Sequence, residues 1–555
     1  MPKINVSKKE LDLLIGKKIE LDKLNDLMTN YLKAEIDSSK ENELTVKFED
    51  TNRPDLWSAE GIARNLKNLL GITSGLHVYK TENAGYVVNV DDKKLEDKRP
   101  FIACAVIKNI KLTDELIKSF MQMQDKLDTN YGRKRKKTSI GFYDLDKLSF
   151  PIIYTTVASD HAKFVPLGFD KEMNMKEIIN THPKGIEYGH LVKSFKEYPV
   201  LIDSNSKILS FPPIINSNDL GNINKETKNL LIEVTGTDHS AVINTLGIIT
   251  IALADHEAKI YSVDINYKKK KEKTPVLKPI EFSFKPSGIK KVLGLNLNNK
   301  EIQKILEKMG YDVLNINKES DKATVEAPFY RKDIMHDVDI IEDIAIGYGY
   351  NEIEPVSPRI ATEGSLDKLT TKTDLIRDIM IGIGHQEILS FMLTNKNTMF
   401  EKMNQKAKDV AELANPISTN WDILRNSLSP IMINFLAINK TVEFPQRIFE
   451  VGDVVSLDDK EENKVRQKRN LCAAISHSKA TFTEMKSVLD KLLSDLGLIA
   501  SIKPIENPSF IDGRCGEILI DKNPIGIIGE VHPQVLINFG LENPVSIFEI
   551  NVDEL

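Results

Sequence analysis

The chain has 555 residues, of which 41% are hydrophobic and 28% charged, so it is expected to fold as several globular domains. Its formal net charge of −6 excludes a uniformly basic nucleic-acid-binding protein, and any contact with nucleic acid must be local.

The first 85 residues are predicted to form a small mixed α/β domain. Apolar residues recur at helical spacing in "SKKELDLLIG" and "LDKLNDLMTNYLKAEID", and they alternate as in a strand in "ELTVKFED". Pro54 precedes a further helix that Gly71 ends. The polar stretch "TENAGY", residues 81–86, marks the expected domain boundary.

Residues 86–275 are expected to form a β-rich domain with interspersed helices. The predicted strands are "FIACAVIKNI", "PIIYTTVA", "PVLIDSN", "LLIEVTGTD" and "AKIYSVDINY". The basic run "GRKRKK" at 132–137 predicts a solvated loop, with a phosphate-contacting patch as the alternative. The polar run "KKKKEKTP" at 268–275 predicts a linker.

Residues 276–360 combine two strands, a helix and a second, acidic helix, which predicts a small winged-helix-like module. Such modules often bind DNA, but the acidic surface argues against phosphate contact here. The closing "GYGY" predicts the end of the acidic helix, with a glycine cap.

Four carboxylates gather in this acidic segment. Asp339, Glu342 and Asp343 are spaced i, i+3, i+4 and are expected to share the helix face opposite its apolar stripe, with Asp333 folding back over them. Oxygen ligands favour a hard cation such as Mg²⁺ or Ca²⁺. The alternative is an acidic helix start that is stabilised by the helix dipole alone.

Residues 361–555 alternate helices and strands. A helix and strand in "KTDLIRDIMIGIGHQEILSFML" precede strands in "FPQRIFEVGDVVSL", "RNLCAAIS", "CGEILIDKNPIGIIGEVH" and "VSIFEINV". This order predicts one broad antiparallel sheet flanked by helices, so the expected fold class is multidomain α/β and α+β.

The sequence lacks the common motifs for phosphate binding and hydrolysis, a cysteine zinc site and a membrane span. There is no GxxxxGK[ST] loop, no GxGxxG after a strand, no GxSxG and no HExxH. The cysteines, Cys104, Cys472 and Cys515, form no CxxC, which excludes a cysteine zinc site and favours a reducing, cytoplasmic location. No run reaches the roughly 18 apolar residues of a membrane span, so no membrane partner is expected.

Nine stretches, in order along nearly the whole chain, resemble the β subunits of archaeal and eukaryotic phenylalanyl-tRNA synthetases. The most specific are "SFPPIINS" and "IIEDIAIGYGYNEI". The others are "FEDTNRPDLWSAEGIARNL", "GRKRKKTSIGFYDLD", "HPKGIEYGHL", "VTGTD", "ANPISTNWDILRNSL", "IFEVGDVV" and "IGIIGEVHPQVL".

The resemblance implies an enzyme subunit that works with an α subunit in an (αβ)₂ heterotetramer. The holoenzyme attaches phenylalanine to tRNA(Phe) with ATP, and the ATP-binding residues lie on the α subunit. Residues 361–555 resemble the class II synthetase core but carry no arginine two residues before Glu450, where the class has one. They are therefore expected to be a catalytically silent copy, with no residues catalytic for aminoacylation.

The resemblance also implies two sites on this chain. The magnesium ligands of the family match Asp333, Asp339, Glu342 and Asp343, where members often have Glu at the last position. The pocket that edits mischarged tyrosyl-tRNA maps onto Leu201, Ser210, Glu233 and Thr235. Glu233, where archaeal members often have Asp, would accept the tyrosine hydroxyl proton, while Ser210 and Thr235 would orient the substrate or a water.

Two alternatives stay open from the sequence. One is a free-standing hydrolase of mischarged tRNA, which would not need residues 361–555. The other is a nucleic-acid-binding scaffold built on the winged-helix-like module, which would not need "SFPPIIN" together with Glu233 and Thr235.

Overall fold

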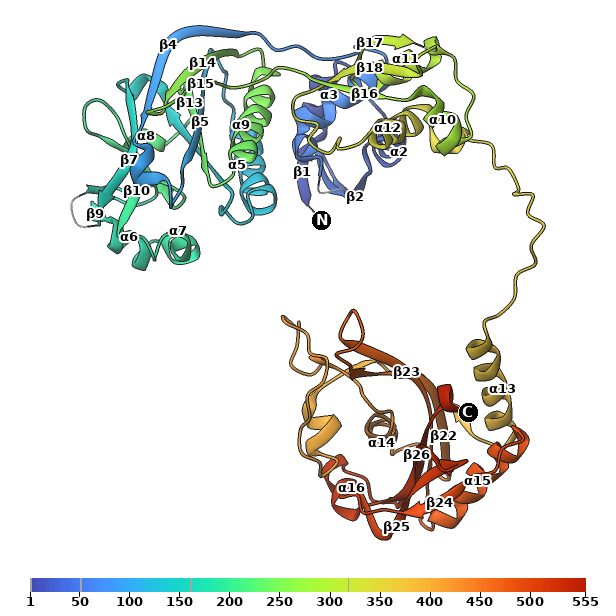
Figure 1. The fold of residues 1–555 in the computed structure, drawn as a ribbon. Helices are drawn as coiled ribbons and strands as arrows, with labels where there is room; N and C mark the ends of the chain where they lie inside the picture. The colour runs from blue at the N-terminus through green and yellow to red at the C-terminus, as the bar shows by residue number, and fades with distance from the viewer. Residues whose placement is uncertain (1, 50–51, 160–161, 318) are drawn as a thin grey trace. The chain divides into compact units, whose positions relative to one another are not determined.

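The structure is a computed structural model that describes residues 2–49, 52–159, 162–317 and 319–555 (Figure 1). The chain divides into two compact units, Met1–Ser357 and Pro358–Leu555. Asp50 and Thr51, part of one of the family-like stretches, lie outside the described residues.

The N-terminal part of the first unit is a three-stranded antiparallel sheet with three helices. Its strand order is β1-β3-β2, and Ser7 and Ser58 cap α1 and α3. The second helix was predicted to continue to Asp37, but α2 ends earlier. Lys33 adopts the left-handed conformation and ends the helix, and the chain continues as β2. The elements are β1 (Lys3–Ser7), α1 (Lys8–Ile15), α2 (Leu21–Leu32), β2 (Ala34–Lys40), β3 (Glu43–Phe48) and α3 (Ala59–Leu69).

A ten-stranded sheet forms the next part of this unit. Nine strands follow the order β12-β11-β10-β7-β4-β14-β5-β13-β6, and β15 pairs with β14. All five predicted strands are confirmed in it. The strands are β4 (Thr81–Val90), β5 (Phe101–Lys108), β6 (Thr138–Asp144), β7 (Ile152–Ala158), β10 (Glu197–Ile202), β11 (Ile208–Phe211), β12 (Ile215–Asn216), β13 (Leu230–Gly236), β14 (Lys259–Asn266) and β15 (Lys271–Thr274).

Two polar segments at the edges of this region are strands rather than connections. The stretch expected to be a boundary, 81–86, begins β4, which pairs in parallel with β14. The expected linker at 268–275 contains β15, whose backbone pairs with β14 from Val263 to Asn266. Both predictions rested on polarity, and the exposed side chains of edge or half-covered strands are polar too.

Helices cover the middle of the large sheet. Figure 1 shows α5 (Asp114–Lys126) and α9 (His239–Ala254) beside β5 and β13, and every residue of β13 is buried. Burial on both faces explains the nearly continuous apolar runs of β5 and β13. The remaining elements here are α4 (Asp92–Leu95), α6 (Met175–Thr181), α7 (Pro183–Tyr188), α8 (Asn218–Gly221) and a hairpin of β8 (Lys163–Phe164) and β9 (Met173–Asn174).

The last part of the first unit packs three helices on a small antiparallel sheet of order β16-β18-β17. The predicted acidic helix ends at Tyr348, with Gly349 at φ +106° as its cap, as expected. The elements are β16 (Ile280–Phe284), α10 (Pro286–Leu293), α11 (Asn299–Lys308), β17 (Asp312–Asn317), β18 (Lys322–Ala327) and α12 (Asp337–Tyr348).

The second unit is a seven-stranded sheet of order β19-β22-β23-β27-β26-β25-β24, antiparallel except for the β19–β22 pair. Alternate residues of β22 and β23 pack against α13 and α15 on one face and against α14 on the other, so the predicted flanked sheet is confirmed. The elements are α13 (Lys368–Gly382), β19 (Gln386–Glu387), β20 (Leu393–Thr394), β21 (Ile423–Leu424), α14 (Ser429–Ile438), β22 (Gln446–Leu457), β23 (Val465–Ser476), α15 (Phe482–Asp495), β24 (Ser501–Pro504), β25 (Phe510–Ile520), β26 (Asn523–Val531), α16 (Pro533–Phe539) and β27 (Val545–Asn551).

Candidate functional site

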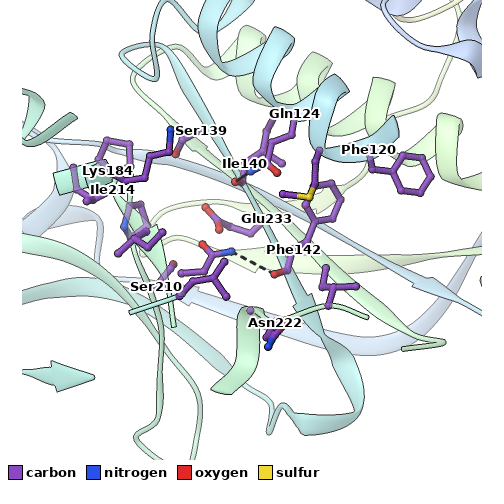
Figure 2. Close-up of a pocket in the computed structure, with 18 of the residues that line it drawn as sticks. Phe120, Gln124, Ser139, Ile140, Phe142, Lys184, Ser210, Ile214, Asn222 and Glu233 are labelled. Carbon is purple, nitrogen blue, oxygen red and sulfur yellow. Dashed lines mark hydrogen bonds between the residues drawn. The ribbon is translucent and has the colours of Figure 1, made fainter. Parts of the chain in front are cut away.

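A cavity of about 530 Å³ opens beside the β6–β13 edge of the large sheet (Figure 2). Its walls come from α5, β6, β11 and the segment that follows β11. Most of the lining is apolar, and it includes the aromatic rings of Phe120, Phe142 and Phe211. A cavity of this size and character suits a small molecule or side chain with an aromatic ring.

Glu233 places a carboxyl group in this apolar surrounding. It lies at the middle of β13, is 2% exposed, and points into the cavity in Figure 2. The Tyr143 hydroxyl donates to Glu233 Oε2 at 2.7 Å. Burial raises the pKa of Glu233 to about 7, although the Tyr143 hydrogen bond and the nearby Arg99 charge oppose the shift.

Gly141 makes the space that this carboxyl group occupies. It lies on β6 directly opposite Glu233. A Cβ at Gly141 would be 2.3 Å from Glu233 Oε2 and 2.5 Å from the Tyr143 hydroxyl. Such distances are far below van der Waals contact, so any side chain at this position would displace one of the two groups.

Of the four predicted pocket residues, Ser210 and Glu233 line the cavity and the other two do not. The Ser210 hydroxyl is buried and makes no hydrogen bond of standard geometry in the described part of the chain, although it lies close enough to the Tyr143 hydroxyl to oppose the rise in the pKa of that group. A buried hydroxyl without a partner is costly, so a bound group that completes it would be stabilised. Leu201 is paired with Ser210 across β10 and β11, but its side chain is buried in the apolar core with Leu209 and does not line the cavity.

Thr235 stands behind the wall, where it is bound to a buried arginine. Arg99 Nε donates to Thr235 Oγ1 at 2.9 Å, and Arg99 Nη2 donates to Ser139 Oγ at 3.0 Å. Burial lowers the pKa of Arg99 from its usual value. Thr235 therefore positions Arg99 and Ser139, and Ser139 is the member of this group that lines the cavity.

A second arginine forms part of the opposite wall. Arg135 donates to the backbone oxygens of Pro213 and Ile214 at 3.1 and 2.9 Å, and its guanidinium lies 4.5 Å from the centre of the Tyr188 ring. It forms an ion pair of 3.1 Å with the buried Asp128. These contacts join the loop before β6 to the segment after β11, which closes the cavity on that side.

The four acidic residues predicted to bind a metal are not brought together as one set. Arg331 donates to both Asp333, at 2.8 Å, and Asp343, at 2.6 Å, and all three side chains are largely buried. Asp343 was expected on the open face but is 5% exposed, because its helix is covered from two sides and its carboxylate also accepts from Tyr311.

The other two acidic residues lie apart from this buried pair. Asp339 Oδ2 accepts the backbone N–H groups of Met335 and His336, both at 2.7 Å, at the start of α12. Glu342 is exposed and pairs with Lys33 at 2.8 Å. The donor set therefore does not fit a four-carboxylate cation site in this arrangement, because Arg331 already neutralises two of its members.

Among the described residues, a different group has the spacing of metal ligands. Glu10, Glu60 and His256 bring one possible ligand atom each within 4.8 Å of one another. His256 Nε2 is 2.8 Å from Glu60 Oε1, and this hydrogen bond and charge raise the pKa of His256 against the opposing effect of burial. Glu60 Oε1 and His256 Nε2 therefore already pair with each other, whereas Glu60 Oε2 is buried and has no hydrogen-bond partner among the described residues.

Comparison with known proteins assigns the chain to a family. Residues 282–350 match the tRNA synthetase B5 domain, and residues 353–552 match the phenylalanyl tRNA synthetase beta chain CLM domain. The phenylalanine–tRNA ligase beta subunit of Thermococcus sibiricus is 43% identical over 99% of this chain and 98% of that protein. The chain belongs to the phenylalanine–tRNA ligase beta subunit family. The beta subunit of Methanococcus maripaludis is 38% identical over the full length of both chains.

A solved structure of the family covers the part that holds the cavity. An N-terminal fragment of the Pyrococcus horikoshii phenylalanyl-tRNA synthetase beta subunit is 42% identical, with a TM-score of 0.60 over 62% of this chain and 99% of that one. The family resemblance found in the sequence is thus confirmed. No helix among the described residues is long and apolar enough to cross a membrane.

The sequence did not reveal the partners that shape the beta subunit's cavity. Arg99 and Asp128 lie in none of the family-like stretches. Gly141 and Tyr143 belong to "GRKRKKTSIGFYDLD", but nothing in that stretch shows that they face Glu233. The only available signal was the register of "SIGFYD", in which a glycine interrupts an otherwise bulky strand.

Proposed function

We propose that the cavity at Glu233 hydrolyses the ester of a tyrosine wrongly attached to tRNA. The observation that carries this proposal is a buried carboxyl group in a cavity with aromatic walls. Tyrosine differs from phenylalanine by one hydroxyl, and an apolar pocket rejects an added hydroxyl only about 10²-fold. A second site that accepts a hydrogen bond from that hydroxyl selects tyrosine positively, because phenylalanine leaves the acceptor unpaired.

The surrounding residues have separate parts in this proposal. Glu233 accepts a hydrogen bond from the hydroxyl of the tyrosine substrate. The Tyr143 hydroxyl, which donates to Glu233 Oε2, holds the carboxyl group in place. The Ser210 hydroxyl orients the substrate or the attacking water. The water oxygen bonds to the ester carbonyl carbon, the bond to the ribose oxygen breaks, and that oxygen takes up a proton. Thr235 and Leu201 support the walls from behind.

We also propose that the chain works as the β subunit of a phenylalanine–tRNA ligase, in an (αβ)₂ complex that uses ATP and tRNA(Phe). Its second unit is then a silent copy of the class II synthetase core. Glu450 is 1% exposed and its Oε1 accepts from Arg425 at 2.8 Å, so neither side chain of this pair is free to bind phosphates. The B5-matching region is the winged-helix-like module in the same proposal.

The magnesium prediction survives in a narrower form. Glu342 is exposed and Asp339 is half-buried, whereas Arg331 already binds Asp333 and Asp343. An ion at α12 would therefore be held by Asp339 and Glu342, with water completing its shell. Mg²⁺ there would tie α12 to its neighbours and would supply no chemistry to the cavity.

The alternatives are less well supported. A free-standing hydrolase has no need of the 353–552 region, which matches the CLM domain of the family. A scaffold has no need of a buried carboxyl group in an apolar cavity. The relatives that match over their whole length are named as ligase subunits.

The proposal is tested by charging assays with the assembled complex. Glu233→Ala should allow tyrosyl-tRNA to accumulate in the presence of tyrosine, ATP and tRNA, while phenylalanine charging stays near wild type. If the variant accumulates no more tyrosyl-tRNA than wild type, the cavity is not the editing site.

A further inference from the structure

The basic run at 132–137 forms a second hollow next to the proposed editing cavity. Arg133, Lys134 and Lys137 line an open groove of about 740 Å³ together with Tyr131, Asp238 and Ser240. Lys137 pairs with Asp238 at 2.9 Å. Arg133 and Lys134 are exposed, and the described residues offer their side chains no ion pair or hydrogen bond. The groove therefore carries two uncompensated positive charges on a chain whose net charge is −6.

The loop that carries these charges is ordered by its own backbone. Arg133, Lys134 and Arg135 are three consecutive non-glycine residues with φ between 51° and 63°. The N–H groups of Lys134 and Arg135 donate to the oxygens of Thr129 and Asp128, both at 2.9 Å. A left-handed conformation costs roughly 1–3 kcal/mol per residue and persists only where the surroundings impose it. The cations are thus held in place rather than spread over a mobile tail.

One residue of the same loop connects the groove to the cavity. Arg135 lines the cavity, whereas its neighbours Arg133 and Lys134 line the groove. A strand of nucleic acid whose 3′ end enters the cavity must leave its preceding phosphates outside. The groove lies on the adjoining side of this loop, and its charge is complementary to those phosphates.

We propose that this groove binds the backbone of the single-stranded 3′ end of tRNA and so delivers the aminoacyl ester to the cavity. The inference rests on the proposed editing function for the identity of the RNA. Arg133 and Lys134 pair with phosphates, and the half-buried Tyr131 lines the same groove. Recognition is by charge and not by base sequence, because the groove presents cations rather than a set of base-reading donors and acceptors.

The test replaces Arg133 and Lys134 by Asn, which removes both charges and tolerates a left-handed backbone better than Ala. The matched control is Lys193→Asn with Lys196→Asn, two exposed lysines that line neither hollow. Both double variants are prepared in the assembled complex. They are assayed with preformed tyrosyl-tRNA and with 3′-O-tyrosyl-adenosine, which carries the ester but no backbone phosphate.

The proposal predicts that R133N/K134N raises KM for tyrosyl-tRNA about tenfold with kcat unchanged, and leaves hydrolysis of tyrosyl-adenosine at the wild-type rate. The slope of log Kd for tRNA against log salt should fall by about 1.4, since each single-strand phosphate contact contributes about 0.7. The control variant should show none of these changes.

The proposal would be overturned if R133N/K134N left KM and the salt slope unchanged, or if the control variant showed an equal effect. It would also be overturned if R133N/K134N no longer bound the α subunit but kept its tRNA affinity, because the loop would then contact a protein and not RNA. If wild type hydrolyses neither substrate, the editing function fails, and the salt slope still decides whether the groove binds RNA.

Discussion

Glu233 illustrates at the scale of one residue how a binding group costs stability. Its pKa is about 7 in the folded chain and about 4.5 when exposed, so the protonated form favours folding. That stabilisation is fully present below pH 4.5 and is lost as the pH rises towards 7. Glu233→Gln keeps the shape of the side chain without the charge. As the pH rises from 5 to 8, the stability of this variant relative to wild type should therefore increase by up to about 3 kcal/mol.

The measurement for this prediction is the difference in thermal midpoint between the assembled Glu233→Gln and wild-type complexes at the two pH values. The difference removes the contribution of other titrating groups, such as Asp128, whose pKa burial also raises to about 7. A difference that does not change with pH would mean that the carboxyl group stays solvated.

Gly141 offers an independent test at the same scale. The Cβ of Gly141→Ala would overlap Glu233 Oε2 and the Tyr143 hydroxyl. We expect tyrosyl-tRNA hydrolysis to fall at least about tenfold and stability to fall by about 1–3 kcal/mol from overpacking. Gly382→Ala is the control, because a Cβ there meets nothing within 4 Å. Wild-type hydrolysis by Gly141→Ala would contradict the placement of the carboxyl group.

At the scale of an element, α12 shows why periodicity placed Asp343 on the wrong face. The spacing of its acids was correct, but the helix is covered by α10 and α11 and by α2 of the N-terminal part. Arg331 lies just before the helix and supplies a buried countercharge for Asp343. A tertiary ion pair of this kind leaves no trace in the local pattern of charged and apolar residues.

Asp339→Ala with Glu342→Ala tests what this helix needs. Asp339 accepts two backbone N–H groups at the helix start, and losing such a cap costs about 1 kcal/mol. We expect the double variant to unfold at a lower temperature with and without magnesium. Wild type should gain a further increase in midpoint with Mg²⁺ over chelator, which the variant lacks. Equal midpoints of the wild-type complex in both buffers would contradict the magnesium proposal, but not the role of Asp339 at the start of the helix.

Strands were predicted better than the connections between them. β5 and β13 were recognisable because burial on both faces requires long apolar runs. The first residues of β4 and all of β15 were mistaken for a boundary and a linker, because these residues are mostly polar and their pairing with β14 is set by distant residues. The same limit applies to the cavity: Glu233 and Ser210 were found through the family, while Arg99 and Gly141 depend on sheet register.

In the whole molecule, editing and aminoacylation are proposed to lie on different subunits. The second unit has Ile448 two residues before Glu450, where a phosphate-binding arginine would be required, and Arg425 is taken up by Glu450. We therefore expect the isolated chain to form no phenylalanyl-adenylate. ATP–pyrophosphate exchange with phenylalanine measures this directly, with the assembled complex as the positive control. Exchange by the purified chain alone would contradict a silent second unit.

We propose that the Glu233 carboxylate selects tyrosine for hydrolysis. The most direct measurement compares deacylation of preformed tyrosyl-tRNA and phenylalanyl-tRNA by the assembled wild-type and Glu233→Ala complexes. A charge-assisted hydrogen bond contributes about 1.5–3 kcal/mol, so its loss should slow tyrosyl-tRNA hydrolysis by roughly 10- to 150-fold. Phenylalanyl-tRNA hydrolysis should be unchanged or slightly faster, because Ala removes an unpaired carboxylate. Equal tyrosyl-tRNA rates in the two complexes would contradict the account.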